Sequence, residues 1–256
     1  MTGEPAHGAV VLLEADWPAP HGVRAGTTER VGGVSEGPYA SLNLGAHVGD
    51  DARAVQINRE RAARALALPA APLWLEQRHG TAVCCHTGAV GAEPPVADAA
   101  VALAPGRVLA VLTADCLPVV LARRDGTGVA VAHAGWRGLA AGVLEAACRE
   151  LAAPGGDLVA WLGPGIGPAA FEVGPEVRQA FLDQDRRAEQ AFAANARGRW
   201  QADLFALARL RLARLGVAVT GGGHCTDQDQ ARWYSARRSS PTGRMATFAW
   251  LEPEGR

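Results

Sequence analysis

The sequence contains no lysine, since all 25 residues counted as lysine or arginine are arginine. This absence excludes Schiff-base enzymes, pyridoxal-phosphate attachment and Walker A phosphate loops, because each of them needs a lysine amine. Anionic groups must instead be bound by guanidinium groups or by backbone amides.

Low net charge and the absence of a long uninterrupted apolar run exclude further classes of protein. The net charge is only −1, so no basic footprint for nucleic acid or an anionic membrane is evident. The most apolar stretch, residues 96–122, is interrupted by Asp98, Arg107 and Asp115 and does not predict a membrane span. The five cysteines show no disulfide-like framework and the N-terminal segment does not resemble a signal peptide. We therefore expect a reduced compartment, the cytosol.

The order of apolar segments and turn signals predicts an α+β fold. We expect one catalytic domain over residues 1–256, built as a single layered sandwich of a mixed β-sheet and helices. The expected helices cover residues 52–68, 139–151 and 203–215, with another from 175. The expected strands cover residues 73–75, 81–86, 108–113, 119–122, 129–132, 158–162 and 245–251, the last completing the mixed sheet.

Three soft-metal ligands stand in distinctive local sequences: His79, Cys116 and His133. One thiolate and two imidazoles would give a zinc ion three protein ligands and leave a fourth position for water or substrate, as in catalytic zinc sites. Their spacing is too wide for a zinc finger, so only the fold could bring them together. Cys116 and His133 each follow an apolar strand, and strand ends commonly carry reactive groups.

The same residues allow a second mechanism without metal. Cys116 would act as a thiolate nucleophile with His133 as its base, while His79 orients or assists. Asp115 lies beside the cysteine and is a further candidate acid or base. Zinc would bind the same sulfur atom, so the two mechanisms compete, and residue types alone leave both open.

Arginines are the candidate anion-binding residues in a chain without lysine. Arg30 lies in the turn-rich segment 27–35, and Arg137 directly follows the His133 motif. The glycines of segment 163–168 do not form a dinucleotide loop, because the prolines remove amide donors. His224 and Cys225 are interpreted as loop residues, and Cys148 as a core residue.

Across nearly its whole length the sequence resembles the family variously called peptidoglycan editing factor, polyphenol oxidase or laccase-domain protein, and purine nucleoside phosphorylase. The segments that carry the resemblance are Gly32-Gly-Val-Ser35, Ser41-Leu-Asn-Leu-Gly45, His47-Val-Gly-Asp50, Trp74-Leu-Glu-Gln77 with His79-Gly, Thr113-Ala-Asp-Cys-Leu-Pro118, His133-Ala-Gly-Trp-Arg-Gly138, Leu162-Gly-Pro164, Phe171-Glu-Val-Gly174, Cys225-Thr226 and Thr242-Gly-Arg-Met245. The chain departs from the family pattern at Arg78, where a small apolar residue is usual.

The resemblance implies zinc bound by His79, Cys116 and His133, and a fold like that of cysteine-hydrolase-type bacterial toxins. It also implies phosphorolysis of adenosine, inosine and methylthioadenosine, and deamination of adenosine. The implied substrate-binding residues are Arg30, Asn43 and Arg137, and the implied partners are purine nucleosides and phosphate. We expect no nucleic-acid, membrane or dedicated protein partner.

Two rival activities remain within this resemblance. One is an amidase that removes wrongly built cell-wall precursors (UDP-muramyl-amino acids), using Cys116 or water activated by zinc. The other is copper-dependent oxidation of polyphenols, with copper substituting for zinc. Multicopper oxidases need many histidines, largely in His-X-His pairs, whereas this chain has seven histidines and no such pair. Oxidation is therefore the least favoured of the three.

Overall fold

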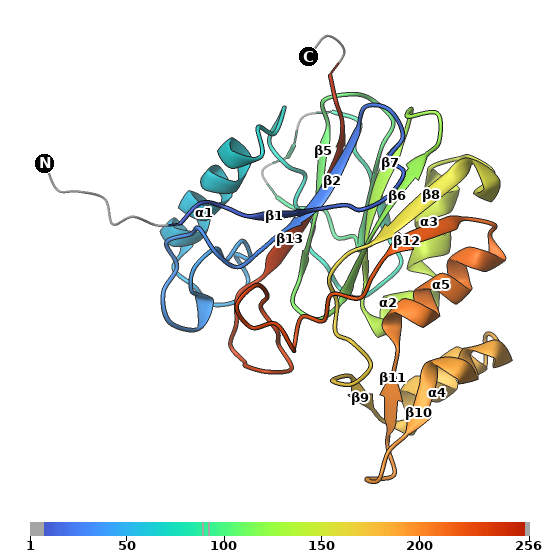
Figure 1. Cartoon of the computed structure of the whole chain (residues 1–256). Coiled ribbons are helices and arrows are strands. Elements are labelled where there is room, and N and C mark those ends of the chain that lie inside the picture. The colour runs from blue at the N-terminus through green and yellow to red at the C-terminus, as the bar shows by residue number, and fades with distance from the viewer. Residues whose placement is uncertain (1–7, 89, 92, 254–256) are drawn as a thin grey trace, which may run out of the picture.

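The computed structural model describes residues 8–88, 90–91 and 93–253 of the chain (Figure 1). The α-helices are α1 (Ala52–Ala65), α2 (Trp136–Ala141), α3 (Val143–Glu150), α4 (Pro175–Leu182) and α5 (Leu204–Arg214). The strands are β1 (Leu12–Glu14), β2 (Val23–Thr28), β3 (Val83–Cys85), β4 (Ala99–Ala102), β5 (Val108–Thr113), β6 (Leu117–Arg123), β7 (Val129–Ala134), β8 (Leu158–Leu162), β9 (Glu172–Val173), β10 (Phe192–Ala194), β11 (Trp200–Ala202), β12 (Ala218–Gly221) and β13 (Met245–Leu251).

Two β-sheets pack face to face at the centre of the molecule. One is antiparallel, in the order β1-β2-β13-β5, and the other is mixed, in the order β12-β8-β6-β7-β4-β3. In the mixed sheet, β12 pairs with β8 and β3 with β4 in parallel, and the remaining pairs are antiparallel. Leu109 and Val111 of one sheet share a buried cluster with Val120 and Val131 of the other. Strands with both faces buried have near-continuous apolar sequences, as β5 to β7 do.

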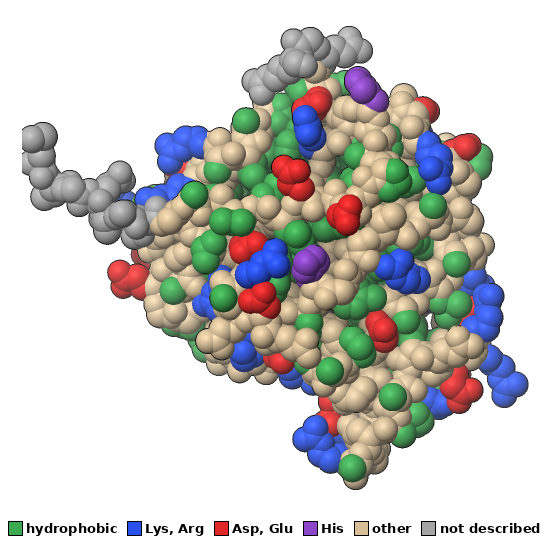
Figure 2. Space-filling view, in the orientation of Figure 1, with side chains coloured by type: hydrophobic (Ala, Val, Ile, Leu, Met, Phe, Trp, Pro, Cys, Tyr) green, Lys and Arg blue, Asp and Glu red, His purple; other side chains and the backbone are tan. Residues whose placement is uncertain are grey.

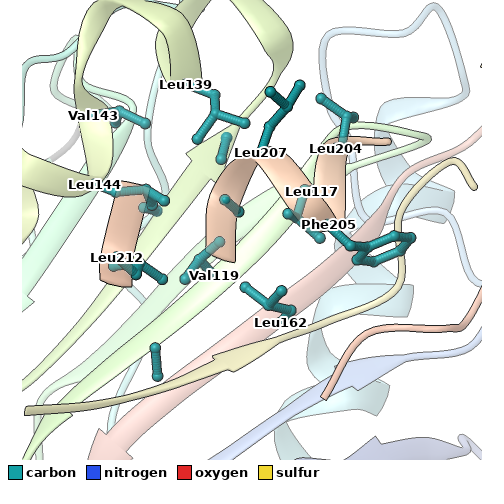
Figure 3. Packing of buried hydrophobic residues seen from close by; sticks show 14 of the residues in the cluster. Leu117, Val119, Leu139, Val143, Leu144, Leu162, Leu204, Phe205, Leu207 and Leu212 are labelled. Carbon is teal, nitrogen blue, oxygen red and sulfur yellow. The ribbon is translucent and has the colours of Figure 1, made fainter. Parts of the chain in front are cut away.

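Helices cover the outer face of each sheet (Figure 1). On the mixed sheet, Leu117 and Val119 pack against Leu144 of α3 and Leu207 of α5 (Figure 3). On the antiparallel sheet, α1 and the segment before it cover the face that carries Phe248. The layers therefore run helix, sheet, sheet, helix. A small antiparallel sheet, β10-β11-β9, lies with α4 at one end of the molecule (Figure 1).

The structure confirms the α+β class but corrects the single sheet. The predicted closing strand 245–251 forms as β13, yet it pairs antiparallel with β2 and β5 in a sheet of its own. Periodicity shows that a strand is buried but not which sheet it joins. Segment 73–75 forms no strand and contributes an isolated bridge from Leu73 to Leu109. The likeness to the toxin fold stays a prediction.

The starts of α1, α4 and α5 follow local signals, whereas α1 ends at Ala65, before the predicted end at residue 68. Asp51 and Asp203 cap α1 and α5 by accepting hydrogen bonds from Ala54 N and Ala206 N. The predicted continuous helix 139–151 is wrong: it is divided at Gly142, whose φ of 104° places it in the left-handed region.

In the part of the chain that the structure describes, no helix is long and apolar enough to cross a membrane. Both signs of charge are interspersed on the face seen in Figure 2.

Candidate metal centre

The side chains of His79, Cys116 and His133 come together, although they lie far apart in the sequence. One ligand atom from each, two imidazole nitrogens and a thiol sulfur, all lie within 4.8 Å of one another. The Cys116 Sγ to His79 Nε2 distance is 3.6 Å. Tetrahedral zinc with ordinary Zn–S and Zn–N bond lengths would place two such donors about 3.6 Å apart. The three residues therefore fit a soft, zinc-like ion with an open fourth position.

Three different segments deliver these ligands. Cys116 lies in the turn between β5 and β6, and His133 lies in β7, where it is paired in register with Pro118 of β6. His79 precedes β3 and has a φ of 59°, a left-handed conformation that is uncommon for residues other than glycine. The antiparallel pairing of β6 and β7 thus places the cysteine and one histidine together, and a strained turn adds the other.

Asp98, directly before β4, connects the two histidines. Its Oδ1 accepts hydrogen bonds of 2.8 Å from both His133 Nδ1 and His79 N. Its Oδ2 accepts from Gly80 N at 2.7 Å and from Arg78 N at 3.1 Å. Metal-bound histidines commonly donate their other ring nitrogen to a carboxylate, which fixes the tautomer and the ring orientation. Asp98 therefore directs His133 Nε2 toward the candidate metal position and holds the turn that carries His79.

Asp98 was not among the residues predicted to form the site, since in sequence it is only an interruption of an apolar run. The residue is 1% exposed, so its charge is buried and must be compensated. A lone aspartate within the otherwise apolar segment 96–102 was the signal that could have identified it. Its partners could not be identified from sequence, because they lie on other strands and turns.

The electrostatics of the site couple Cys116 to the histidines. Burial alone would raise the pKa of the Cys116 thiol, but the charges and hydrogen bonds of His133 and His79 lower that pKa to about 6. Burial opposes charging of His133 as well, yet the Cys116 thiolate and Asp98 raise its pKa to about 9. In metal-free protein at neutral pH these shifts favour a thiolate at Cys116 beside an imidazolium at His133, which are the protonation states of a Cys-His dyad.

Gly135 allows the ligands to approach this closely. A Cβ at this position would lie 2.7 Å from His79 Cδ2 and 2.9 Å from Cys116 Sγ, shorter than real Cβ contacts. The glycine that precedes α2 thus leaves the space in which two of the three ligands meet.

Asp115, which directly precedes Cys116, is held by hydrogen bonds from the segment 226–237. Its φ is 90°, and its carboxylate accepts hydrogen bonds from Thr226 Oγ1 (2.6 Å), Ser235 Oγ (3.0 Å) and Arg237 N (2.7 Å). These contacts fix the turn that presents Cys116. They also connect the carboxylate to two hydroxyl groups.

The three predicted substrate-binding residues differ in how far their side chains are already engaged in contacts within the protein. Arg30 donates to the carbonyl oxygens of Ala40 and Gln230 and stacks on Tyr234. Asn43 is fully buried and hydrogen-bonded to neighbouring loops through both its amide oxygen and its amide nitrogen. Arg137 is exposed, and its guanidinium carbon lies 4.4 Å from the centroid of the Trp136 ring.

The glycine-rich segment 163–168 and the pair His224–Cys225 contact each other. Gly165 forms a bridge with Cys225, and Cys225 Sγ accepts a hydrogen bond of 3.2 Å from Gly167 N. His224 and Cys225 are loop residues, as predicted, and their loop adjoins the glycine-rich segment, which was not predicted. Cys148 lies on α3 and is buried in the core cluster, also as predicted.

The family described as multi-copper polyphenol oxidoreductase laccase matches residues 24–252. This chain belongs to that family. A Pseudomonas aeruginosa protein named purine nucleoside phosphorylase is 54% identical over 245 residues, covering 94% of this chain and 98% of the relative. Purine nucleoside phosphorylase YfiH of Escherichia coli is 51% identical over 241 residues, covering 94% of this chain and 98% of that protein.

Solved structures of the family share the fold. A Neisseria meningitidis protein has a TM-score of 0.90 at 47% identity, covering 94% of this chain and 99% of its own. YlmD of Geobacillus stearothermophilus has a TM-score of 0.82 at 31% identity, covering 98% of each chain. The stacked sheets described above are therefore the family's architecture, and the three-ligand cluster lies within the matched region.

Proposed function

We propose that this protein is a zinc-dependent enzyme that cleaves purine nucleosides by phosphorolysis. The observation that carries the proposal is the cluster of His79, Cys116 and His133 with a buried carboxylate behind it. Relatives that are about half identical over nearly the whole chain bear the name purine nucleoside phosphorylase, which supports the same activity here. All five cysteines are free thiols, which supports a cytosolic location.

The reaction needs few chemical groups. A phosphate oxygen forms a bond to ribose C1′ while the C1′–N9 bond breaks, and the purine leaves with the electron pair and takes up a proton. Zinc held at the three ligands would supply a Lewis acid toward a substrate oxygen or water. Arg137 lies exposed beside the His133 motif and would attract anionic groups to the site.

Asp115 is the proposed carrier of the proton. Its carboxylate accepts hydrogen bonds from the hydroxyl groups of Thr226 and Ser235, which provide a path for exchange. The substrate set that we propose is adenosine, inosine and methylthioadenosine, together with deamination of adenosine. Arg30 and Asn43 would act in substrate binding through the loops that they connect.

The test uses the zinc-loaded full chain with adenosine, with and without inorganic phosphate, and chromatographic separation of products. Phosphate-dependent release of adenine that disappears in Cys116→Ser is the expected result, and inosine would report deamination. Cys85→Ser is the matched control, because Cys85 is an exposed thiol on an edge strand outside the cluster. No adenine and no inosine from zinc-loaded protein would refute the proposal.

A second candidate rests on the paired Cys116 and His133. Asp98 orients the imidazole, so the three residues form a Cys-His-Asp arrangement suited to nucleophilic hydrolysis of an amide. This supports the alternative of an amidase acting on muramyl-amino-acid precursors. Release of an amino acid from such a precursor by chelator-treated enzyme would favour it, since thiolate catalysis needs a sulfur free of metal.

Oxidation of polyphenols with copper remains the weakest candidate, despite the family's description. Multicopper oxidases need several histidine-rich copper sites. Among the residues that the structure describes, His79, Cys116 and His133 form the single metal-ligand cluster. Copper at this cluster would be a substitute for zinc at one site.

A further inference from the structure

A cavity of about 410 Å³ opens beside the segments that carry two of the metal ligands. Its size is within the range of small-molecule sites. Gln77 and Arg78, which directly precede His79, line it together with Leu112 near the end of β5. The remaining lining residues are Ala46, His47, Arg59, Trp74, Leu75, Glu76 and Pro94. Neither His47 nor Arg59 was predicted from sequence to have a role in the site.

Arg59 is held in position at the wall of this cavity. It projects from α1, its guanidinium carbon lies 4.0 Å from the centroid of the Trp74 ring, and its Nε donates to Leu44 O at 3.0 Å. Trp74 is itself fixed by an edge contact with Phe248, with ring centroids 5.8 Å apart. Stacking and one hydrogen bond leave the two terminal nitrogens of the guanidinium fork for another partner. Within residues 8–88, 90–91 and 93–253 those two nitrogens have neither a carbonyl nor a carboxylate acceptor.

The cavity has a local excess of positive charge. Glu76, the acidic lining residue, is paired with Arg78 rather than with Arg59. The pKa of His47 is lowered by partial burial and by the positive charges of Arg244, Arg59 and His133, so each of these three groups lies within electrostatic reach of His47. Burial lowers the pKa of Arg59 to about 10, which still leaves the guanidinium charged at neutral pH. A partly desolvated guanidinium that has no carboxylate partner in this cavity calls for an anion.

We propose that Arg59 and His47 bind a phosphate-like oxyanion in this cavity, beside the metal centre. The inference rests on the proposed function, in which inorganic phosphate is a co-substrate. A guanidinium fork matches two oxygens of a phosphate, and the imidazole adds a third donor. This location differs from the sequence-based candidates, because the guanidinium of Arg30 is occupied by backbone carbonyls and Arg137 lies on the exposed start of α2.

The experiment compares the zinc-loaded full chain with Arg59→Met, Arg59→Lys and Arg53→Met. Methionine keeps much of the apolar stem on Trp74 and removes the charge, while lysine keeps the charge and removes the fork. Arg53 lies exposed on the same helix and provides the matched control. Binding of inorganic phosphate is measured by calorimetry without nucleoside, and the KM values for phosphate and adenosine are measured separately.

Arg59→Met is expected to raise the phosphate Kd and KM about 10- to 100-fold. Arg59→Lys should fall between it and the wild type, and Arg53→Met should match the wild type. The KM for adenosine should change far less. An unaltered phosphate Kd and KM in a folded Arg59→Met protein would overturn the proposed site. A larger increase in the phosphate Kd in Arg137→Met than in Arg59→Met would also overturn it. Phosphate binding that depends on Arg59 in an enzyme that releases no adenine would retain the site and refute the phosphorylase proposal.

Discussion

Asp98 Oδ1 lies 2.8 Å from His133 Nδ1, and both side chains are buried where the start of β4 pairs with the end of β7. The same oxygen accepts the backbone N–H of His79, so one carboxylate orients two ligands of the candidate metal centre. A substitution of Asp98 is therefore expected to act directly on metal binding and only indirectly on substrate binding.

Asp98→Asn should weaken zinc affinity about 10- to 100-fold. A neutral amide holds the imidazole less strongly than a carboxylate does, and the substitution removes the negative charge next to His133. Competition with a chromophoric chelator gives the zinc Kd directly. Asp16→Asn, at an exposed position, serves as the control. Equal zinc affinity in Asp98→Asn and wild type would show that Asp98 has no part in ligand orientation.

Gly135→Ala should reduce zinc binding, since the new methyl group would collide with the side chains of Cys116 and His79. The matched control is Gly156→Ala, where a Cβ meets no atom within 4 Å. Metal content after dialysis, compared between the two variants at equal helix content, is the measurement. Full zinc occupancy in Gly135→Ala would mean that the ligands can separate without losing the ion.

Cys116 in metal-free protein should react with iodoacetamide with a pH midpoint of about 6. Because the pKa of Cys116 is lowered, its reactive thiolate forms as the pH rises through about 6, and the alkylation rate falls at lower pH. Cys148 should stay unreactive through pH 9, because burial raises its pKa to about 12. Mass spectrometry of each alkylated peptide gives both profiles, and added zinc should protect Cys116. A midpoint near that of an ordinary thiol would contradict the thiolate–imidazolium pair.

Gly142→Ala should destabilise the fold by about 1–2 kcal/mol without loss of zinc. The left-handed φ of 104° at the junction of α2 and α3 is strained for any side chain, while the space around a Cβ there is adequate. Urea denaturation monitored by circular dichroism provides the free energy of unfolding. An unchanged midpoint would indicate that the junction relaxes into a continuous helix, as the sequence had suggested.

The three candidate metal ligands could be identified from sequence because each stands in a short motif whose residue types are chemically informative. The buried strands β5 to β8 were also accessible, since continuous apolar runs bounded by turns predict them. Short strands such as β9 to β11 were missed, because two or three residues carry too little periodicity to distinguish a strand from a loop.

Local sequence therefore determined which residues can bind a soft metal and which segments must be buried. Tertiary structure alone decided that β13 joins β2 and β5, that Asp98 lies behind both histidines, and that Arg59 faces the cavity next to them. Each of these relationships joins residues that are distant in the chain. Such contacts depend on which strands pair and which faces pack, and a pattern of period 2 or 3.6 carries no information about the partner.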